Sequence, residues 1–295
     1  MEKKILTTWE SKTTPARMIG KAIIPENGYF FDGRIVGDDV RVKASLNYLL
    51  TKWLEDRGLE FTANNIVRIN NTQHTPIIIT YNPDNFRINE RGVQVSNSPA
   101  DGLVILHNDP LAKEIIPAMG TADCVPLTFQ ALNCSGIIHI GYKGLFSGII
   151  EELLKVLTKY EGNDLSQVKF SIGPAATNLS FPEGVNLNGI QSFQNLYKHT
   201  KLIQVRDSSD SLRLKTFDKN PSEAPKLLIQ FLPLVLTHLV NVLNIDPKII
   251  ECSGIDTTFQ TGLYSHRRDF TEDTELNSKY YSNNLTYLLM RYILN

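Results

Sequence analysis

The chain has 295 residues, of which 42% are hydrophobic, and its 30 basic and 31 acidic side chains leave a formal net charge of −1. This length can bury a sizeable core, in one large domain or two small ones. The near-zero charge lacks the one-signed field that attracts nucleic acids and membrane surfaces, so we predict neither as a partner.

In chain order, the first predicted element is a helix over residues 38–58, where apolar residues recur every three to four positions and Gly58 ends the pattern. Further helices are predicted over 145–160, 227–245 and 278–294. Short runs rich in Ile and Val and bounded by Gly, Pro, Asn or Asp predict buried strands. They are residues 66–70, 76–81, 102–106, 125–129, 136–140, 168–172 and 248–254.

The most hydrophobic stretch, residues 227–245, is long enough to raise the question of a membrane span. It contains Gln230, Pro233, His238 and Asn241, which a spanning helix tolerates poorly, so we predict a helix packed on a sheet. Three cysteines are too few for a disulfide framework, and the N-terminus lacks the apolar core of a signal peptide. We therefore predict a cytoplasmic protein with free thiols.

The order of the elements predicts the fold class. Strands outnumber helices and do not alternate with them one for one, which favours a mixed-sheet α+β sandwich over a doubly wound parallel sheet. No Pro/Gly-rich linker divides the chain, so residues 1–295 are predicted to form a single domain. Residues 176–225 are more polar and irregular, and we interpret them as an insertion over one edge.

Three side chains carry the strongest chemical signal. His74 precedes a predicted strand, Cys124 lies in the segment "TADCVPL", and His139 lies in "GIIHIGYKG". Two imidazoles and a thiolate are good zinc ligands, and three protein ligands leave the fourth tetrahedral position open, as in catalytic zinc sites.

Two other interpretations of the same residues stay open. Each of the three side chains can be a core residue, because cysteine packs as a small hydrophobe and a buried histidine can bond a backbone carbonyl. Cys124 and His139 can also form a nucleophile–base pair without a metal, with Asp123 or another carboxylate orienting the imidazole.

Cationic side chains mark a candidate anion site. Lys143 stands just ahead of the predicted helix 145–160, where backbone N–H groups favour negative charge. The adjacent Arg267 and Arg268 can hold a phosphate or carboxylate bidentately. The alternatives are a solvated surface lysine and an arginine that pairs with Asp256 or Asp269 for structural reasons.

Five segments together resemble the YfiH-like laccase-domain family, which is also named multi-copper polyphenol oxidoreductase, peptidoglycan editing factor and purine nucleoside phosphorylase. They read "ADGLVIL", "GTADCVPLTF", "GIIHIGYKGLFSGIIEELL", "FSIGPA" and "CSGIDTTFQTGLYSHRRD". Their order and spacing agree with the family from Ala100 to Pro174 and again from about Cys252 to Asp269. A "TADC" strand followed by an "HxGxxG" turn is fairly specific.

The resemblance implies zinc ligation by His74, Cys124 and His139. It also implies a mixed α/β sandwich shared with a toxin-type cysteine hydrolase. The implied activity is phosphorolysis of purine nucleosides such as adenosine, inosine and methylthioadenosine, with nucleoside and phosphate as partners and with adenosine deamination in some members. The sequence predicts no particular oligomeric state.

The chain departs from the family pattern around the predicted ligands. Lys143 replaces an arginine and loses its planar fork, Tyr142 replaces a tryptophan, Thr75 replaces a glycine and Ala175 a frequent cysteine. The Lys143 change and the glycine missing at Thr75 favour one alternative, a non-catalytic nucleoside-binding homologue. The others are a cell-wall precursor hydrolase with Cys124 as nucleophile, and a copper-dependent polyphenol oxidoreductase, for which six histidines are few.

Overall fold

The structure is a computed structural model. It describes residues 5–14, 16–22, 29–31, 34–36, 62–71, 74–89, 92–181, 189–205, 227–259, 265, 267, 284–288 and 290. The helix predicted over residues 38–58 lies outside these described residues.

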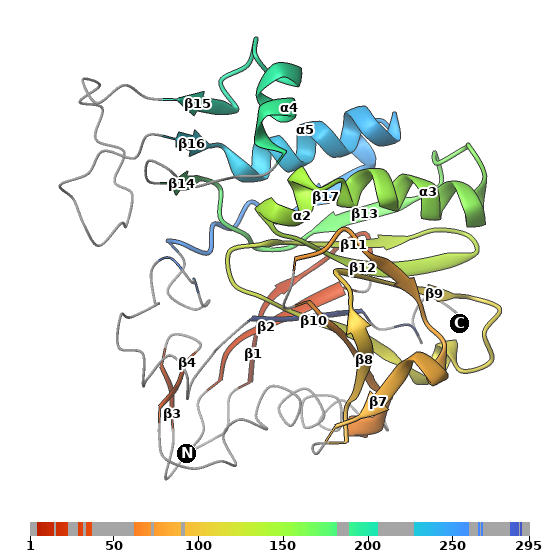
Figure 1. The fold of residues 1–295 in the computed structure, drawn as a ribbon. Helices are drawn as coiled ribbons and strands as arrows, with labels where there is room; N and C mark the ends of the chain where they lie inside the picture. Colours follow the sequence, from red (N-terminus) through yellow and green to blue (C-terminus); the bar gives the residue numbers. More distant parts are fainter. Residues whose placement is uncertain are drawn as a thin grey trace.

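Two large sheets form the body of the fold (Figure 1). The six-stranded sheet has the order β17 (Ile250–Cys252), β13 (Lys169–Ile172), β11 (Val125–Gln130), β12 (Cys134–Ile140), β9 (Gly102–Leu106) and β6 (Ile78–Thr80). The seven-stranded sheet has the order β1 (Ile5–Glu10), β2 (Ala16–Ala22), β18 (Asn284–Leu288), β10 (Ile116–Thr121), β5 (Ile66–Asn70), β8 (Gln94–Pro99) and β7 (Phe86–Ile88). Both sheets mix parallel and antiparallel pairs, and the predicted mixed-sheet α+β class is confirmed.

Smaller elements complete the described structure. β14 (Leu179–Phe181), β16 (Leu227–Ile229) and β15 (Ile203–Val205) form a three-stranded sheet, and β3 (Tyr29–Phe31) pairs with β4 (Arg34–Val36). The helices are α2 (Tyr142–Phe146), α3 (Ile149–Glu161), α4 (Ile190–Leu196) and α5 (Phe231–Leu243). Of the described helices, none has the length and apolar character to cross a membrane.

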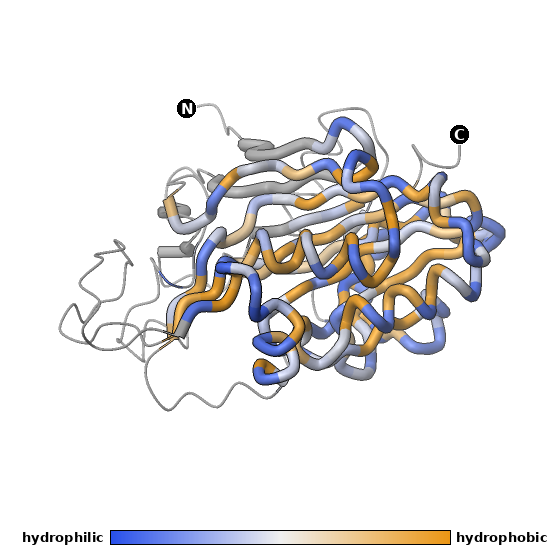
Figure 2. Tube along the Cα trace, turned by 90° about the horizontal axis from the view of Figure 1, so that it is seen from above, coloured by the Kyte–Doolittle hydropathy of each residue, from blue (hydrophilic) through white to orange (hydrophobic). Residues whose placement is uncertain are grey.

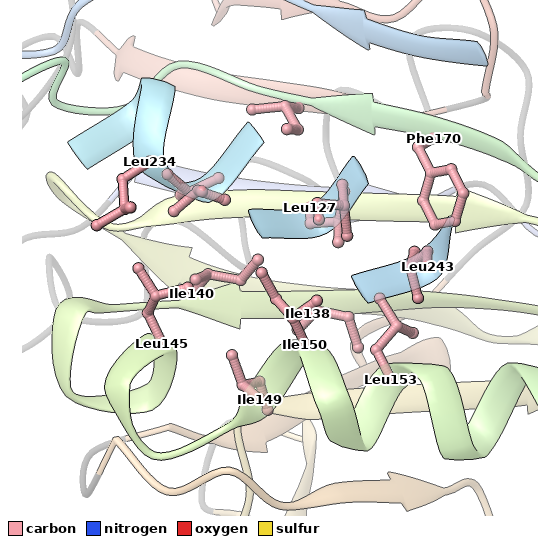
Figure 3. Close-up of a cluster of buried hydrophobic side chains, with 14 of the residues drawn as sticks. Leu127, Ile138, Ile140, Leu145, Ile149, Ile150, Leu153, Phe170, Leu234 and Leu243 are labelled. Atoms are coloured by element: carbon pink, nitrogen blue, oxygen red, sulfur yellow. The ribbon is translucent and has the colours of Figure 1, made fainter. Parts of the chain in front are cut away.

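Helices α3 and α5 cover one face of the six-stranded sheet, and the seven-stranded sheet lies on its other side (Figure 1). Seen from above, hydrophobic residues concentrate in the strands and helices of these layers (Figure 2). Between helices and sheet, Leu153 of α3 and Leu243 of α5 lie near Leu127 and Phe170 of the sheet (Figure 3). Burying one such side chain stabilises the fold by about 1.5–3 kcal/mol.

Alternation along β12 decides which side chains face the second sheet. Ile138 and Ile140 belong to the core under the helices, whereas Ile137 belongs to the core between the two sheets. Because successive side chains of a strand point to opposite faces, His139 shares the face of Ile137. The sequence "GIIHI" therefore places one imidazole between the sheets, near the carboxyl end of β12.

Each predicted strand overlaps an observed strand, but two predicted helices include strands in their described residues. Residues 284–288 of the predicted helix 278–294 form β18, which pairs with β10 and β2. Residues 227–229 of the predicted helix 227–245 form β16, and α5 starts at Phe231. The predicted helix 145–160 is divided into α2 and α3 at Gly148, whose φ of 95° interrupts a helix. Periodicity alone does not separate a short apolar helix from a buried strand.

The polar segment predicted over 176–225 contains regular structure in its described part. It holds β14, α4 and β15, and Phe181, Phe193 and Tyr197 are buried in the core under the helices. The strands of this segment pair with β16, which lies far along the chain, and that pairing leaves no local periodic signal.

The carboxylate of Glu251, on β17, binds residues 11–13, which follow β1. Glu251 accepts hydrogen bonds from the Ser11 hydroxyl at 2.6 Å, from the backbone N–H groups of Lys12 and Thr13, and from the Thr13 hydroxyl. Burial by itself would raise the pKa of Glu251, but these donors lower it from 4.5 to about 2.

A carboxylate whose pKa is depressed in the folded state stabilises the fold fully above its unfolded pKa and loses that effect as pH falls through the folded value. We therefore expect Glu251→Gln to lower the free energy of unfolding at pH 7 by roughly 1–2 kcal/mol, a value reduced for solvent screening. The deficit should shrink between about pH 4.5 and pH 2. Denaturant unfolding of both proteins across this range measures it, and a deficit independent of pH would contradict the assignment.

Candidate metal centre

A cavity of about 930 Å³ opens where strands of both sheets end. The parallel neighbours β5 and β10 of the seven-stranded sheet end at the same edge, and β12 of the six-stranded sheet ends beside them. The residues that surround the cavity are Arg68, Ile69, Asn70, Asn71, His74, Val95, Gly120, Thr121, Ala122, Asp123, Cys124, His139, Gly141, Tyr142, Lys143, Leu179, Phe181, Phe231 and Arg267.

The structure brings the three predicted ligands together in this cavity. His74 comes from the loop after β5, Cys124 from the bend between β10 and β11, and His139 from β12. One nitrogen of each imidazole and the Cys124 sulfur all lie within 4.8 Å of one another. In a zinc tetrahedron the corresponding ligand–ligand distances are roughly 3.3–3.8 Å, so small side-chain movements would suffice to close this set on an ion.

His74 has two features of a ligand. Its φ of 50° lies in the left-handed region, which histidine adopts more often than bulkier residues, and this conformation turns the chain between β5 and β6. Its Nδ1 is buried and has no hydrogen-bond partner within the described part of the chain. Burial is the main cause that lowers the pKa of His74, and the nearby His139 lowers it further. A lowered pKa favours the neutral imidazole that metals bind.

His139 is tied to a carboxylate that the sequence interpretation did not single out. Its Nδ1 lies 2.6 Å from Oδ1 of Asp101, and both side chains are buried. Burial alone would lower the pKa of His139, but the Cys124 thiolate and Asp101 raise it to about 10. A bound cation would compete with the proton on this imidazole, so metal uptake is expected to release protons.

The carboxylate next to His139 is therefore Asp101, not Asp123. Asp123 accepts hydrogen bonds from the Thr257 hydroxyl at 2.9 Å and from the backbone N–H of Arg267 at 2.9 Å, and so it anchors the bend that holds Cys124. The sequence shows that Asp101 directly precedes the predicted strand "GLVIL". In the folded sheet this strand is the neighbour of "GIIHI", which contains His139. The register that sets it beside His139 is a property of the folded sheet.

Gly141 leaves room for two of the candidate ligands. A Cβ atom on Gly141 would lie 2.9 Å from Nδ1 of His74 and 3.2 Å from the Cys124 sulfur. The first distance is shorter than ordinary carbon–nitrogen contact. The His74 ring and the Cys124 sulfur therefore both border the space beside Gly141.

Two of the predicted anion-binding residues, Lys143 and Arg267, border the cavity, whereas Arg268 lies outside the described residues. Lys143 is exposed in the first turn of α2. The guanidinium of Arg267 donates from Nη1 to the Ser180 carbonyl at 2.9 Å and lies 5.2 Å from the centre of the Phe181 ring. Its plane is therefore held in place by the protein.

An aromatic wall, formed by Tyr142, Phe181 and Phe231, also borders the cavity. Tyr142 and Phe181 meet edge to face, with ring centres 5.0 Å apart. The sequence interpretation missed this wall, because its members come from α2, β14 and α5, and only the folded chain unites them.

Residues 53–274 match the family model described as multi-copper polyphenol oxidoreductase laccase. The chain belongs to this family. The resemblance predicted from the sequence motifs is thereby confirmed, and the family description points to a metal ion. The candidate His–Cys–His centre lies within the matched residues.

Two curated relatives are similar over part of the chain. One is purine nucleoside phosphorylase YlmD of Bacillus subtilis, 28% identical over 164 residues, or 53% of this chain and 51% of that protein. The other is a purine nucleoside phosphorylase of Aquifex aeolicus, 35% identical over 72 residues, or 24% of this chain and 33% of that protein. The chain thus matches about half of the first relative and a third of the second.

Solved structures share the fold of this laccase-family chain over nearly its whole length. The hypothetical protein YfiH of Bacillus licheniformis superposes with a TM-score of 0.61 at 17% identity, covering 92% of this chain and 90% of that one. YlmD of Geobacillus stearothermophilus gives a TM-score of 0.59 at 17% identity, covering 96% and 98%. These likenesses confirm the fold.

Proposed function

We propose that the chain is a zinc-dependent purine nucleoside phosphorylase that holds its metal with His74, Cys124 and His139. The observation that carries the proposal is the convergence of these side chains in one cavity with cationic and aromatic residues. The names of both curated relatives support the reaction class. When bound, zinc would supply a Lewis acid that stabilises developing negative charge.

The proposal includes the identity of the metal, zinc, and the cellular compartment, the cytoplasm. One thiolate and two imidazoles in a compact set suit a single zinc ion, whereas a multi-copper centre needs more histidines than the two that this cavity offers among the described residues. All three cysteines are free thiols, which fits a reducing compartment such as the cytoplasm.

The cavity offers separate partners for the two substrates. The aromatic wall of Tyr142, Phe181 and Phe231 suits the flat face of a purine, since aromatic rings stack on bases. Lys143 and Arg267 suit the phosphate, which binds cationic donors. Phosphate held there would form a bond to the anomeric carbon of the ribose, the carbon–nitrogen bond would break, and the base would leave with the electron pair and take up a proton.

Product analysis tests this function. Purified, zinc-loaded protein is incubated with adenosine, inosine or methylthioadenosine, with and without phosphate, and we expect free base and the sugar 1-phosphate only when phosphate is present. Inosine formed from adenosine without phosphate would show the deaminase reaction instead. Binding of nucleoside without any product would contradict the proposal and favour the non-catalytic alternative.

A metal-free thiol hydrolase is the second candidate. The observation that favours it is the row formed by Cys124, His139 and Asp101, in which a carboxylate orients an imidazole beside a thiol. Such an enzyme would act on a cell-wall precursor and keep its activity after chelation. If chelation abolishes nucleoside cleavage and zinc restores it, this candidate is excluded.

Lys143 provides a test of the phosphate subsite. We expect Lys143→Ala to raise KM for phosphate about tenfold, because one charge-assisted contact is lost, with a smaller change in KM for the nucleoside. Lys143→Arg should retain or improve phosphate affinity, since arginine adds a planar fork. Lys155→Ala is the matched control, because this exposed lysine on α3 pairs with Glu152 and does not border the cavity. An equal effect of both alanine variants would contradict the assignment.

A further inference from the structure

Asp101 and His139 contact each other twice. Asp101 directly precedes β9 and His139 lies in the neighbouring antiparallel strand β12, where Gly102 pairs with Ile138. The His139 N–H donates to the Asp101 carbonyl at 2.7 Å, and the side chains meet at 2.6 Å. A backbone and a side-chain contact between the same two residues fix both the position and the rotation of the imidazole ring.

The environment of Asp101 is unusual for a structural carboxylate. Its side chain is 1% exposed, and its Oδ2 has no hydrogen-bond partner within the described structure. A buried carboxylate with one hydrogen bond costs several kcal/mol unless positive charge lies nearby. His139 can supply that positive charge when its ring is protonated, and a cation bound on the far side of the ring, where Cys124 and His74 are found, would supply it instead.

The two histidines offer different nitrogens to the cavity. Nδ1 of His139 is occupied by Asp101, which leaves Nε2 for the side of Cys124. In His74 it is Nδ1 that has no partner and would lie 2.9 Å from a Cβ atom on Gly141, beside the sulfur. A carboxylate thus supports the imidazole of His139, whereas Nδ1 of His74 has no carboxylate partner within the described part of the chain.

We propose that Asp101 is a positioning residue that holds His139 for metal binding through Nε2, while His74 binds the same ion through Nδ1. The inference rests on the metal centre of the proposed function. Carboxylates behind metal-bound imidazoles fix the ring and strengthen the ligand, and their loss typically weakens metal binding 10- to 100-fold.

Zn²⁺ affinity measured by chelator competition tests the role of Asp101. We expect Asp101→Asn, which keeps an acceptor oxygen but loses the charge, to bind Zn²⁺ about 10- to 100-fold more weakly than the parent chain. Glu151→Gln is the matched control, because Glu151 Oε1 lies 2.9 Å from Nε2 of the buried His238, away from the cavity. Its Zn²⁺ affinity should stay within about twofold of the parent. An Asp101→Asn affinity within the same twofold range would overturn the proposal.

The nitrogen linkages can be measured without any variant. The full chain, labelled with ¹⁵N-histidine and loaded with ¹¹³Cd²⁺, should show cadmium coupling to Nε2 of His139 and Nδ1 of His74. Coupling to Nδ1 of His139 would overturn the proposal even if Asp101→Asn fails to fold. A parent chain that binds neither ion would overturn this inference and the metal centre together. These linkages in a chain that cleaves no nucleoside would support the inference and refute the proposed function alone.

Discussion

Cys124→Ala is expected to weaken Zn²⁺ binding at least a hundredfold and to remove nucleoside phosphorolysis. Cys124 supplies the one anionic donor of the three candidate ligands, and its sulfur lies within 4.8 Å of a nitrogen of each imidazole. Loss of that thiolate leaves two neutral nitrogens, which hold zinc weakly at neutral pH. Metal content by elemental analysis and product formation under saturating substrate measure the two effects.

The other cysteines provide the control for loss of a thiol. Cys252 is exposed at the end of β17 and does not border the cavity, so Cys252→Ala should keep both metal content and activity. Thermal unfolding of the apo proteins should show that Cys124→Ala is folded. Activity that survives in Cys124→Ala would refute both the metal centre and the thiol hydrolase, because each needs this sulfur.

Gly141→Ala is expected to reduce Zn²⁺ affinity about as strongly, although no ligand is removed. The added methyl group would lie 2.9 Å from Nδ1 of His74 and 3.2 Å from the Cys124 sulfur, so at least one candidate ligand must move. Gly141 has φ −85° and ψ 164°, which alanine adopts freely, and the effect is therefore steric rather than a result of backbone strain. Chelator competition measures the loss of affinity, and chemical unfolding measures stability.

Gly144, three residues along in the same turn, is the matched control. A Cβ atom there would approach nothing nearer than Ile149 at 4.0 Å. Gly144→Ala should therefore bind Zn²⁺ like the parent chain and, as a helix residue, be neutral or slightly more stable. If the two alanine variants bind zinc equally well, the space beside Gly141 is not part of a metal centre.

The candidate ligands were predictable from sequence because each stands beside a strongly apolar strand. His74 precedes the predicted strand at 76–81, Cys124 precedes "VPLTF" and His139 lies in "GIIHI", and these segments overlap β6, β11 and β12. Their side-chain types, two imidazoles and a thiol, marked them as a candidate ligand set. Whether the three side chains meet depends on strand order: β5 lies in one sheet and β12 in the other. That arrangement is not encoded in any local pattern.

Asp101 and the aromatic wall were missed for a related reason. Asp101 acquires its role through the register between β9 and β12, and Phe181 and Phe231 acquire theirs through the position of the small sheet over the cavity. The helix predicted over 278–294 is wrong at residues 284–288, which form β18. Tyr287 and Leu288 point to opposite faces of the strand and are both fully buried, so the strand shows no alternation of polar and apolar residues. Tertiary packing overrode the local preference there.

The place of β18 in its sheet has a consequence for biogenesis. It lies between β2 and β10, so residues near position 17 and residues near position 287 are direct neighbours in the finished sheet. During synthesis, β2 and β10 emerge long before β18, and the edges that β18 joins stay unpaired until it has been synthesised. Contacts of such sequence separation form slowly, and open edges invite association with other chains. Since β10 leads directly into the bend that carries Cys124, the cavity itself is completed only after β18 has been inserted.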